Sequence, residues 1–270
     1  MSSETPEVIL VKLGGSLITE KARPETPRSE VIRRLAGEIA EAAKGPFRLP
    51  RLILGHGSGS FGHVAARRYG IANGIRSADQ LPGIPLTQQR AAALNRLIVE
   101  ALSNAGALPF SIAPSSCLVS AGGRPASFAA EPLVLAFERG LLPVLYGDVV
   151  LDRERGISIA STEQVFEIVA RCLLNRGWKI RRALWLGETD GLYDESGRTI
   201  PRVSAGDFEE AARAIGDPHG TDVTGGMRLR IETALALARM GIPSLLLNGL
   251  VPGALEKALR EEAVQGTEVL

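Results

Sequence analysis

Val8-Ile9-Leu10-Val11-Lys12-Leu13-Gly14-Gly15-Ser16 is an apolar run that carries a lysine near its end and leads into two adjacent glycines. A short apolar run bounded by glycines is typical of a β-strand buried on both faces. Because glycine has no Cβ atom, the N–H groups of this loop can converge on phosphate oxygens. Lys12 and Lys21 flank the loop, and each adds a positive charge. The stretch predicts a polyanion site, although a strand end, a turn and two solvated lysines fit the same residues.

The overall composition excludes several classes of partner. The 270 residues contain 31 Lys+Arg and 30 Asp+Glu, and a net charge of +1 gives no general attraction to nucleic acid or to an anionic membrane. Cys117 and Cys172 have apolar neighbours and no metal-binding spacing, which predicts buried free thiols in a reducing compartment. The N-terminus is polar, and no apolar run is long enough to span a membrane. We expect a soluble cytoplasmic protein with no nucleic acid and no membrane partner.

Strand patterns alternate with helix patterns along the chain. Glycine-rich turns predict hairpins around Gly122-Gly123 and around residues 153–156. This alternation indicates the α/β class, with a mostly parallel sheet covered on both faces. Three glycine loops, at 14–15, 55–63 and 222–227, are expected at carboxyl ends of strands, where ligands bind. Strands are expected at 8–13, 51–54, 107–112, 141–147, 183–187, 243–248 and at the C-terminus, and helices at 27–44, 87–105, 128–138, 162–176, 206–214, 226–240 and 252–263.

The second glycine loop also matches a dinucleotide-binding pattern. Gly57-Ser58-Gly59-Ser60-Phe61-Gly62 fits G-x-G-x-x-G after an expected strand, with Asp79 further on as a candidate partner of the ribose. The alternative function is therefore an NAD-dependent oxidoreductase. Three features count against it: the motif follows the second strand, the following segment is broken by proline and glycine, and Asp79 lies in a loop-like stretch.

Two of the three histidines, His56 and His63, bracket this loop. A histidine with an ordinary pKa of about 6.5 gains a proton easily when it lies against a dianion. His63 is expected to begin a helix and to point at a ligand. His219 is interpreted as a turn residue.

Five motifs, taken together and in order, resemble the amino acid kinase superfamily, and within it most closely the isopentenyl phosphate kinase branch. None of them alone is as specific as the ordered set. They are Lys12-Leu13-Gly14-Gly15-Ser16 with Lys21, His56-Gly57-Ser58-Gly59-Ser60-Phe61-Gly62-His63, Gly147-Asp148-Val149-Val150, Thr189-Asp190-Gly191-Leu192-Tyr193 and Asp222-Val223-Thr224-Gly225-Gly226-Met227.

The resemblance implies a single domain, residues 1–270, folded as a three-layer αβα sandwich and assembled as a homodimer. It implies an N-terminal lobe, about 1–175, that binds the acceptor, and a C-terminal lobe, about 176–270, that binds ATP. The implied reaction is ATP-dependent phosphorylation of a small phosphate monoester, isopentenyl phosphate, to isopentenyl diphosphate. The implied catalytic residues are Lys12, Lys21 and His63, the substrate-binding residues Ser58, His63 and Thr162, and the ATP-binding residues Lys12, Gly14, Gly15, Ser16, Gly59, Asp190, Tyr193, Gly225, Gly226 and Arg230.

The chemistry of such a transfer fits these residue types. Moving a γ-phosphoryl group needs positioning and charge neutralisation more than covalent help. A phosphate monoester, with a second pKa of about 6, is already a nucleophile at neutral pH, so no general base is required. Mg²⁺ is expected to accompany the ATP phosphates with few protein ligands, and no dedicated protein metal site is expected.

The sequence departs from the branch pattern at the expected substrate end. Ser161-Thr162-Glu163-Gln164 replaces Ser-Gly-Asp-Asp, Arg230 replaces a lysine, and Ser58 stands where glycine is common. These changes leave open a kinase of the same superfamily with another acceptor, such as a phosphonate or a different monophosphate. They also leave open a catalytically inactive binding or regulatory subunit, although the retained lysines, His63 and Asp190 argue against it. Six apolar residues could either wall a pocket for a short apolar tail or be ordinary core: Tyr69, Ile75, Leu81, Ile84, Leu94 and Ile98.

Overall fold

The computed structural model describes residues 5–44, 51–204 and 225–270. Three expectations therefore lie outside the described residues: the helix at 206–214, the turn at His219 and the part of the third glycine loop at 222–224.

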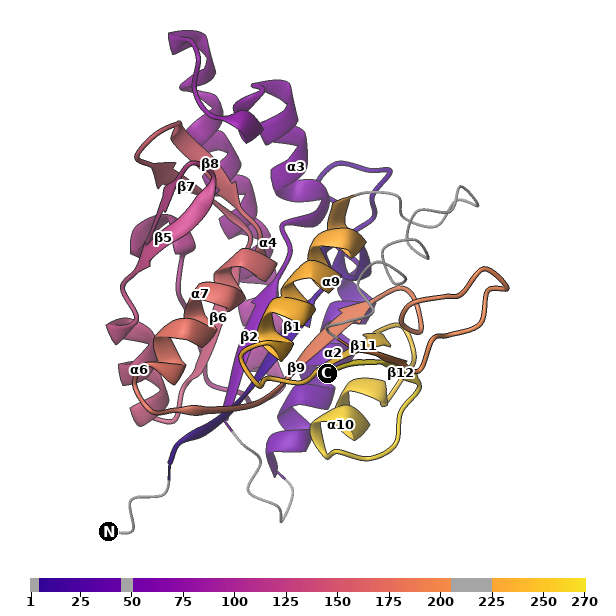
Figure 1. Ribbon diagram of the computed structural model, residues 1–270. Coiled ribbons are helices and arrows are strands. Elements are labelled where there is room, and N and C mark those ends of the chain that lie inside the picture. The colour runs from indigo at the N-terminus through magenta and orange to yellow at the C-terminus, as the bar shows by residue number, and fades with distance from the viewer. Residues whose placement is uncertain (1–4, 45–50, 205–224) are drawn as a thin grey trace.

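A twisted eight-stranded sheet forms the centre of the molecule (Figure 1). Every strand pair in it is parallel except the pair of β11 and β12, which confirms the prediction of a mostly parallel sheet. In spatial order the strands are β10 (Arg202–Val203), β12 (Gly266–Val269), β11 (Ser244–Asn248), β9 (Lys179–Gly187), β1 (Glu7–Leu13), β2 (Arg51–His56), β6 (Leu142–Tyr146) and β3 (Pro109–Ser111).

Strand β1 lies in the middle of the sheet, and its alternate side chains enter two separate hydrophobic cores. Val8 and Leu10 pack in the core under α6 (Glu131–Glu138), α7 (Thr162–Leu174) and α9 (Gly225–Ala238). Ile9 and Val11 pack in the core under α2 (Ser29–Lys44), α4 (Gly83–Asn104) and α10 (Ala254–Leu259). Successive side chains of a strand point to opposite faces, so β1 is apolar throughout because both faces are covered. Helices therefore cover both faces (Figure 1), and the three-layer αβα sandwich is confirmed.

A second, four-stranded sheet lies beside the main one, in the order β5 (Arg124–Phe128), β4 (Leu118–Ala121), β7 (Asp148–Asp152), β8 (Gly156–Ala160). Its two antiparallel pairs are the two predicted hairpins. The Asp152 carboxylate joins them, since it accepts the N–H groups of Gly122, Gly123, Glu154 and Arg155. Burial alone would raise the pKa of Asp152, but these four donors lower it to about 2.

Several element boundaries differ from the sequence predictions. Helix α4 begins at Gly83, four residues before the expected start at Thr87. Gly83 packs closely against Tyr69, since a Cβ on Gly83 would lie 2.4 Å from Cβ of Tyr69. Proline in the first turn of a helix loses no hydrogen bond, so Pro85 does not prevent this early start. Strand β9 begins at Lys179 and α10 has only six residues. The two-residue strand β10 was not predicted.

The segment between β2 and α4 contains α3 (Gly59–Arg68) and the 3₁₀ turns η1 (Ile71–Asn73) and η2 (Ala78–Gln80). Tyr69, Ile75 and Ile84 pack here against a small apolar cluster. In contrast, Leu94 and Ile98 belong to the core between α4 and the sheet, and Leu81 is 50% exposed. The six apolar residues considered for a pocket wall therefore do not form one continuous wall.

Cys117 and Cys172 are free, as expected, but both are half-buried rather than buried. Partial burial, helped by the Asp148 charge, raises the pKa of the Cys117 thiol to about 11. Among the residues described, no helix is both long and apolar enough to cross a membrane. Cys117 ends a single helical turn, α5 (Pro114–Cys117).

Candidate active site

The first two glycine loops lie in contact at the carboxyl ends of β1 and β2. These strands are neighbours and parallel, so both loops leave the sheet at the same edge. A Cβ on Gly15 would lie 2.8 Å from the nitrogen of Gly59, and a Cβ on Gly57 would lie 2.9 Å from the nitrogen of Gly15. Gly59 also has a φ of +49°, a conformation that favours glycine. The loops therefore pack as bare backbones and form one surface.

This surface presents backbone N–H groups. Within the described part of the chain, the N–H groups of Gly15, Ser16, Ser58 and Gly59 have no backbone or side-chain acceptor. Gly59 begins the ten-residue helix α3, whose N-terminal end carries a partial positive charge. Donors of this kind beside a helix N-terminus are suited to bind phosphate oxygens. Glycine at these positions lets the two loops approach closely, which brings their N–H groups together.

Lys12 lies on β1 just before the first loop and is only 4% exposed. Its Nζ is 2.5 Å from Oε1 of Glu163, which is in the first turn of α7 and is also buried. Burial alone would raise the pKa of Glu163, but the positive charges of Lys12 and Arg230 outweigh it and hold that pKa below its ordinary value. The pair is therefore an ionised, buried salt bridge at the floor of the loops.

Arg230 brings a second cation to the same place. It lies in α9, the helix that begins at the third glycine motif, and is 7% exposed. A Cβ on Gly187 would lie 2.7 Å from its Nη1, and a Cβ on Gly14 would lie 3.4 Å from its Nη2. The guanidinium therefore lies against the ends of β1 and β9. Arg230, which the sequence predicted to bind ATP, therefore lies beside the first glycine loop.

Glu163 is the residue that sequence reasoning missed. Its motif, Ser161-Thr162-Glu163-Gln164, predicts a change at the substrate end but does not by itself indicate an ion pair with Lys12. One feature of the sequence could have indicated the pair. Glu163 keeps the negative charge of the branch's aspartate, and Lys12 lies on an apolar strand where a buried lysine needs a carboxylate partner. The structure pairs it with Lys12, close enough to Arg230 for both positive charges to stabilise its carboxylate.

Thr162 was expected to bind substrate, and the structure places its side chain against β2. Its Oγ1 donates to the carbonyl oxygen of His56 at 2.6 Å, and the residue is 1% exposed. Its methyl group lies 2.6 Å from the position that a Cβ on Gly55 would take. The threonine therefore fits because Gly55 leaves space, and its hydroxyl holds the end of β2.

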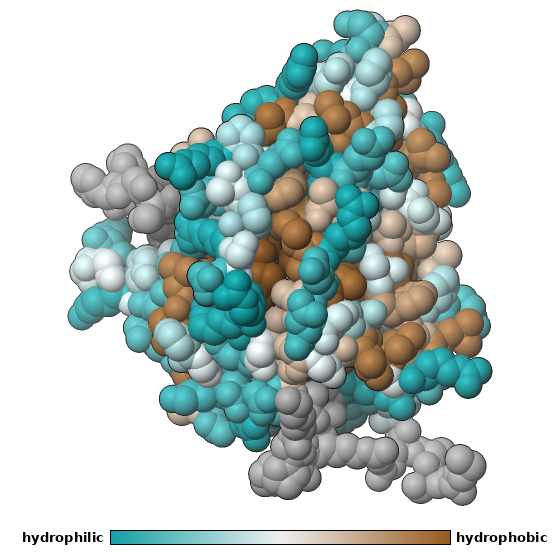
Figure 2. Space-filling model, turned by 180° about the vertical axis from the view of Figure 1, so that it is seen from behind, coloured by the Kyte–Doolittle hydropathy of each residue, from teal (hydrophilic) through white to brown (hydrophobic). Residues whose placement is uncertain are grey.

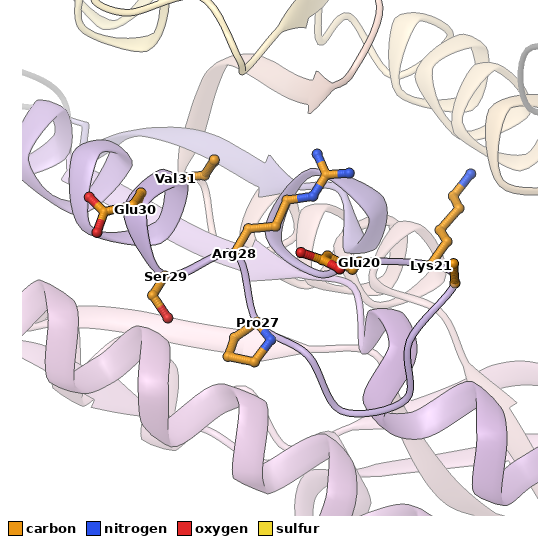
Figure 3. A pocket seen from close by; sticks show the side chains of 8 residues that line it. Glu20, Lys21, Pro27, Arg28, Ser29, Glu30 and Val31 are labelled. Carbon is orange, nitrogen blue, oxygen red and sulfur yellow. The ribbon is translucent and has the colours of Figure 1, made fainter.

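The segment that carries Lys21 follows α1 (Gly15–Ile18), a turn of helix that was not predicted, and is held against α3. Thr19 Oγ1 accepts the N–H of Ser60 at 3.0 Å, and the carbonyl oxygen of Ser60 accepts the N–H of Glu25. Figure 3 shows an open hollow lined by this segment, with the side chains of Lys21 and Arg28 extending to the same side. Arg28 forms an ion pair of 2.8 Å with Glu188, which directly follows β9. The segment thus connects the second loop with the loop after β9.

His63 is the fifth residue of α3 and not its start, so the expectation that it begins a helix is wrong. The helix begins earlier because Gly59 has already turned the chain. The His63 side chain is exposed at one edge of the site. Partial desolvation, together with the charges of Arg67 and Lys12, lowers its pKa, and the Glu163 charge opposes them. Without a ligand the ring is therefore neutral at pH 7.

Asp190 and Tyr193 form a second group, at the ends of β9 and β11. The Tyr193 hydroxyl accepts the N–H of Asp190 at 3.0 Å, and Nδ2 of Asn248 donates to the Asp190 carboxylate at 3.0 Å. The carbonyl oxygen of Gly187 accepts the N–H of Gly249, and Gly187 also packs against Arg230. The group of Asp190 and Tyr193 therefore lies next to the glycine loops and their cations. Of the remaining predicted residues, Gly225 and Gly226 begin α9.

Comparison with known proteins assigns the family. Residues 7–248 match the model of the amino acid kinase family. The chain is a member of that family. Because the match covers β2 and the second loop, it contradicts the alternative of an NAD-dependent oxidoreductase built on Gly57, Gly59 and Gly62.

Individual relatives agree with this assignment. The isopentenyl phosphate kinase of Methanothermobacter thermautotrophicus is 34% identical to this amino acid kinase, over 97% of this chain and 98% of that protein. The isopentenyl phosphate kinase of Methanocaldococcus jannaschii is 28% identical, over 96% of this chain and 97% of that protein. A solved isopentenyl phosphate kinase structure superposes with a TM-score of 0.80 at 30% identity and covers 97% of this chain and 99% of that one.

The Lys12–Glu163 pair yields a prediction for this kinase. Glu163→Gln is expected to lower the free energy of unfolding by about 3 kcal/mol, because it leaves a buried lysine without its carboxylate partner. Urea denaturation at pH 7 measures the change. Since the folded pKa of Glu163 lies below its ordinary value of 4.5, the stabilisation is full above that pH and is lost as the pH falls through the folded pKa.

The matched control is Glu167→Gln, one turn further along α7. Glu167 pairs with Arg171 across the exposed side of the helix, so its loss is expected to cost less than about 1 kcal/mol. Equal effects of the two substitutions would show that the buried pair has no special role. A Lys12→Met change added to Glu163→Gln is expected to cost less than the sum of the two single changes.

Proposed function

We propose that this kinase transfers the γ-phosphoryl group of ATP to isopentenyl phosphate and forms isopentenyl diphosphate. The observation that carries the proposal is the contact between the two glycine loops. Their N–H groups, which have no acceptor within the described residues, lie near the cations Lys12 and Arg230. Such a surface suits the phosphate-rich meeting point of a triphosphate and a phosphate monoester. The names of its relatives give the choice of acceptor.

In the proposed mechanism, ATP lies on the C-terminal lobe, residues 176–270, and on the first loop. Lys12, Gly14, Gly15, Ser16, Gly59 and Arg230 receive its phosphates, and the region of Asp190, Tyr193, Gly225 and Gly226 receives its nucleoside. Bare glycines at contacts where a Cβ would clash favour this role for the loops.

The acceptor lies on the N-terminal lobe, residues 1–175, beside the second loop. The Ser58 N–H and His63 hold its phosphate in line, with Thr162 fixing the end of β2 beside them. A bound dianion raises the pKa of His63, so the neutral ring takes up a proton as the acceptor binds. Lys12 and Lys21 then neutralise charge that develops on the transferred group.

We propose Mg²⁺ as the companion of ATP. As a hard cation with a preference for oxygen ligands, it is held mainly by the triphosphate, where it screens the β- and γ-phosphate charges. In residues 5–44, 51–204 and 225–270, no three His, Cys, Asp or Glu side chains gather in a metal-binding group. We also place the enzyme in the cytoplasm, where the half-buried thiols of Cys117 and Cys172 stay reduced.

A panel of acceptors tests the reaction. ADP release is measured with Mg-ATP and isopentenyl phosphate, shorter and longer alkyl phosphates, a matching phosphonate, or glutamate. We expect isopentenyl phosphate to have a kcat/KM at least about tenfold above the others, because the relatives named for this acceptor are the proteins that the chain resembles along nearly its whole length. Preference for the phosphonate or another monophosphate would support a kinase with a different acceptor. No turnover of any acceptor would favour a binding or regulatory subunit.

Two substitutions distinguish the roles of Lys21 and His63. Lys21→Ala is expected to lower kcat by about 100-fold with less than about a fivefold change in the KM for ATP, because its charge is needed mainly in the transition state. His63→Ala is expected to raise the KM for the acceptor by about tenfold or more, because a charge-assisted hydrogen bond is lost. Steady-state kinetics measure both. Unchanged turnover in the first variant, or a change limited to ATP in the second, would contradict the assignment.

We further propose a homodimer that forms along strand β3. This strand ends the sheet, and because it has three residues and Pro109 lacks an N–H, we expect the contact to be made by side chains rather than by added strand pairing. Apolar side chains are exposed on and beside it, with Leu108 at 63%, Phe110 at 42% and Leu97 of α4 at 39%. Figure 2, which views the molecule from the side of α2 and α4, shows apolar side chains gathered in areas bordered by hydrophilic ones.

Phe110→Glu is expected to convert the dimer into a monomer, because a charge would be buried at the contact. Sedimentation velocity measures the state. Leu151→Glu is the matched control, since Leu151 is 62% exposed on β7 and lies in the smaller sheet, away from β3. A wild-type protein that stays monomeric at high concentration would contradict the proposal.

A further inference from the structure

His56 is a fully buried histidine that the mechanism above does not use. It is the last residue of β2 and directly precedes the second glycine loop. Its ring stacks on Tyr146 of the neighbouring strand β6, with ring centroids 5.5 Å apart and planes inclined by 15°. Its carbonyl oxygen accepts the Thr162 hydroxyl at 2.6 Å and the N–H of Gly147 at 2.9 Å. Both backbone and ring are therefore held in place.

Both ring nitrogens of His56 have polar neighbours. Nδ1 is 3.1 Å from the carbonyl oxygen of Gly57, and Nε2 is 3.1 Å from Oδ1 of Asn95 on α4. Nδ2 of the same amide is 2.6 Å from Oγ of Ser111 on the edge strand β3, to which it donates. A chain of polar contacts thus runs from β3 through the core to the second glycine loop.

The chemistry of these groups assigns the protons. A carbonyl oxygen can only accept, so the contact with Gly57 requires the proton on Nδ1. Burial, with the charge of Lys12, lowers the pKa of His56 to about 4 against the opposing hydrogen bonds, so the ring is neutral and Nε2 is an acceptor. In the structure Oδ1 of Asn95 faces Nε2 and Nδ2 faces the Ser111 hydroxyl, so this tautomer requires the Asn95 amide to be turned over, with its NH₂ group toward Nε2 and its oxygen toward Ser111, whereas the Gly57 carbonyl, which belongs to the backbone, cannot be exchanged in this way. The amide oxygen and nitrogen have nearly the same shape, so this orientation keeps the same distances.

The hydrogen bond from Nδ1 fixes a peptide and not only a side chain. In a planar trans peptide the C=O and the following N–H point in opposite directions. Holding the Gly57 oxygen on His56 therefore directs the Ser58 N–H away from the ring. Within the part of the chain that the structure describes, this N–H has no protein acceptor. Ser58 directly precedes α3, so its N–H lies with the other donors of the loop surface.

We propose that His56 is a positioning residue, held as the neutral Nδ1–H tautomer, which orients the Gly57–Ser58 peptide so that the Ser58 N–H donates to the acceptor phosphate. The tautomer and the peptide orientation follow from contacts within the protein. The identity of the acceptor rests on the proposed function.

The tautomer is tested on the ligand-free enzyme, so the result does not depend on the substrate. With ¹⁵N-labelled histidine there are only three imidazoles to assign, His56, His63 and His219. We expect His56 to show a protonated Nδ1 and an unprotonated Nε2 from about pH 6 to about pH 9. Its ionisable neighbours named above are Lys12 and Tyr146. An Nε2–H tautomer or a protonated ring in this range would overturn the proposal.

Two variants test the effect on the reaction. His56→Leu removes the donor to Gly57, whereas His56→Asn keeps an N–H close to the position of Nδ1. With isopentenyl phosphate as the probe, we expect His56→Leu to raise the KM of the acceptor about tenfold and the KM of ATP less than about threefold. We expect His56→Asn to recover most of that loss.

A purely structural role would give a different result. Equal losses in the two variants, or equal rises in the KM of acceptor and ATP, would overturn the positioning role. Circular dichroism and thermal unfolding check that each variant folds. If His56→Leu does not fold, the tautomer measurement on the wild-type protein still decides the question. If the acceptor panel selects another monophosphate, the same comparison is made with that compound, so failure of the proposed function is distinguished from failure of this one.

Discussion

The candidate site depends on the close approach of two bare backbones. Gly15 and Gly59 come from different strands, yet a side chain on the first would clash with the nitrogen of the second. The sheet makes this contact possible because β1 and β2 are adjacent, parallel and in register to their ends. Every other part of the proposed site, from the charges beneath the loops to the helices above them, is placed relative to this contact.

A site for phosphate groups must also be stable before any phosphate binds. Buried cations would otherwise destabilise the fold, since removing a charge from water is costly. Here Glu163 pairs with Lys12 and also interacts electrostatically with Arg230, so it provides a negative charge within the protein. The ligand therefore meets cations that are already fixed in position, and little reorganisation is needed when the phosphates arrive.

The sequence predicted those features of this kinase that depend on neighbours along the chain. Strand β1, the glycine loops and the two hairpins have local signatures, because burial on both faces and positive φ each select particular residues. The features it missed depend on distant contacts. Glu163 meets a lysine 151 residues away, and β10 is a strand only because it pairs with β12. The early start of α4 likewise depends on packing against Tyr69. The roles of the proposed ligand-binding residues remain predictions, which the experiments above address.

The fit between Gly55 and Thr162 has a consequence for sequence change in this enzyme. A Cβ at position 55 would occupy the same space as the threonine methyl group and the ring of Phe166. Enlarging residue 55 would therefore require both a smaller residue at 162 and a shift of the Phe166 ring, and shrinking Thr162 alone would leave an empty space next to β2. The two positions are therefore expected to show epistasis, because the effect of a change at either one depends on the size of the side chain at the other.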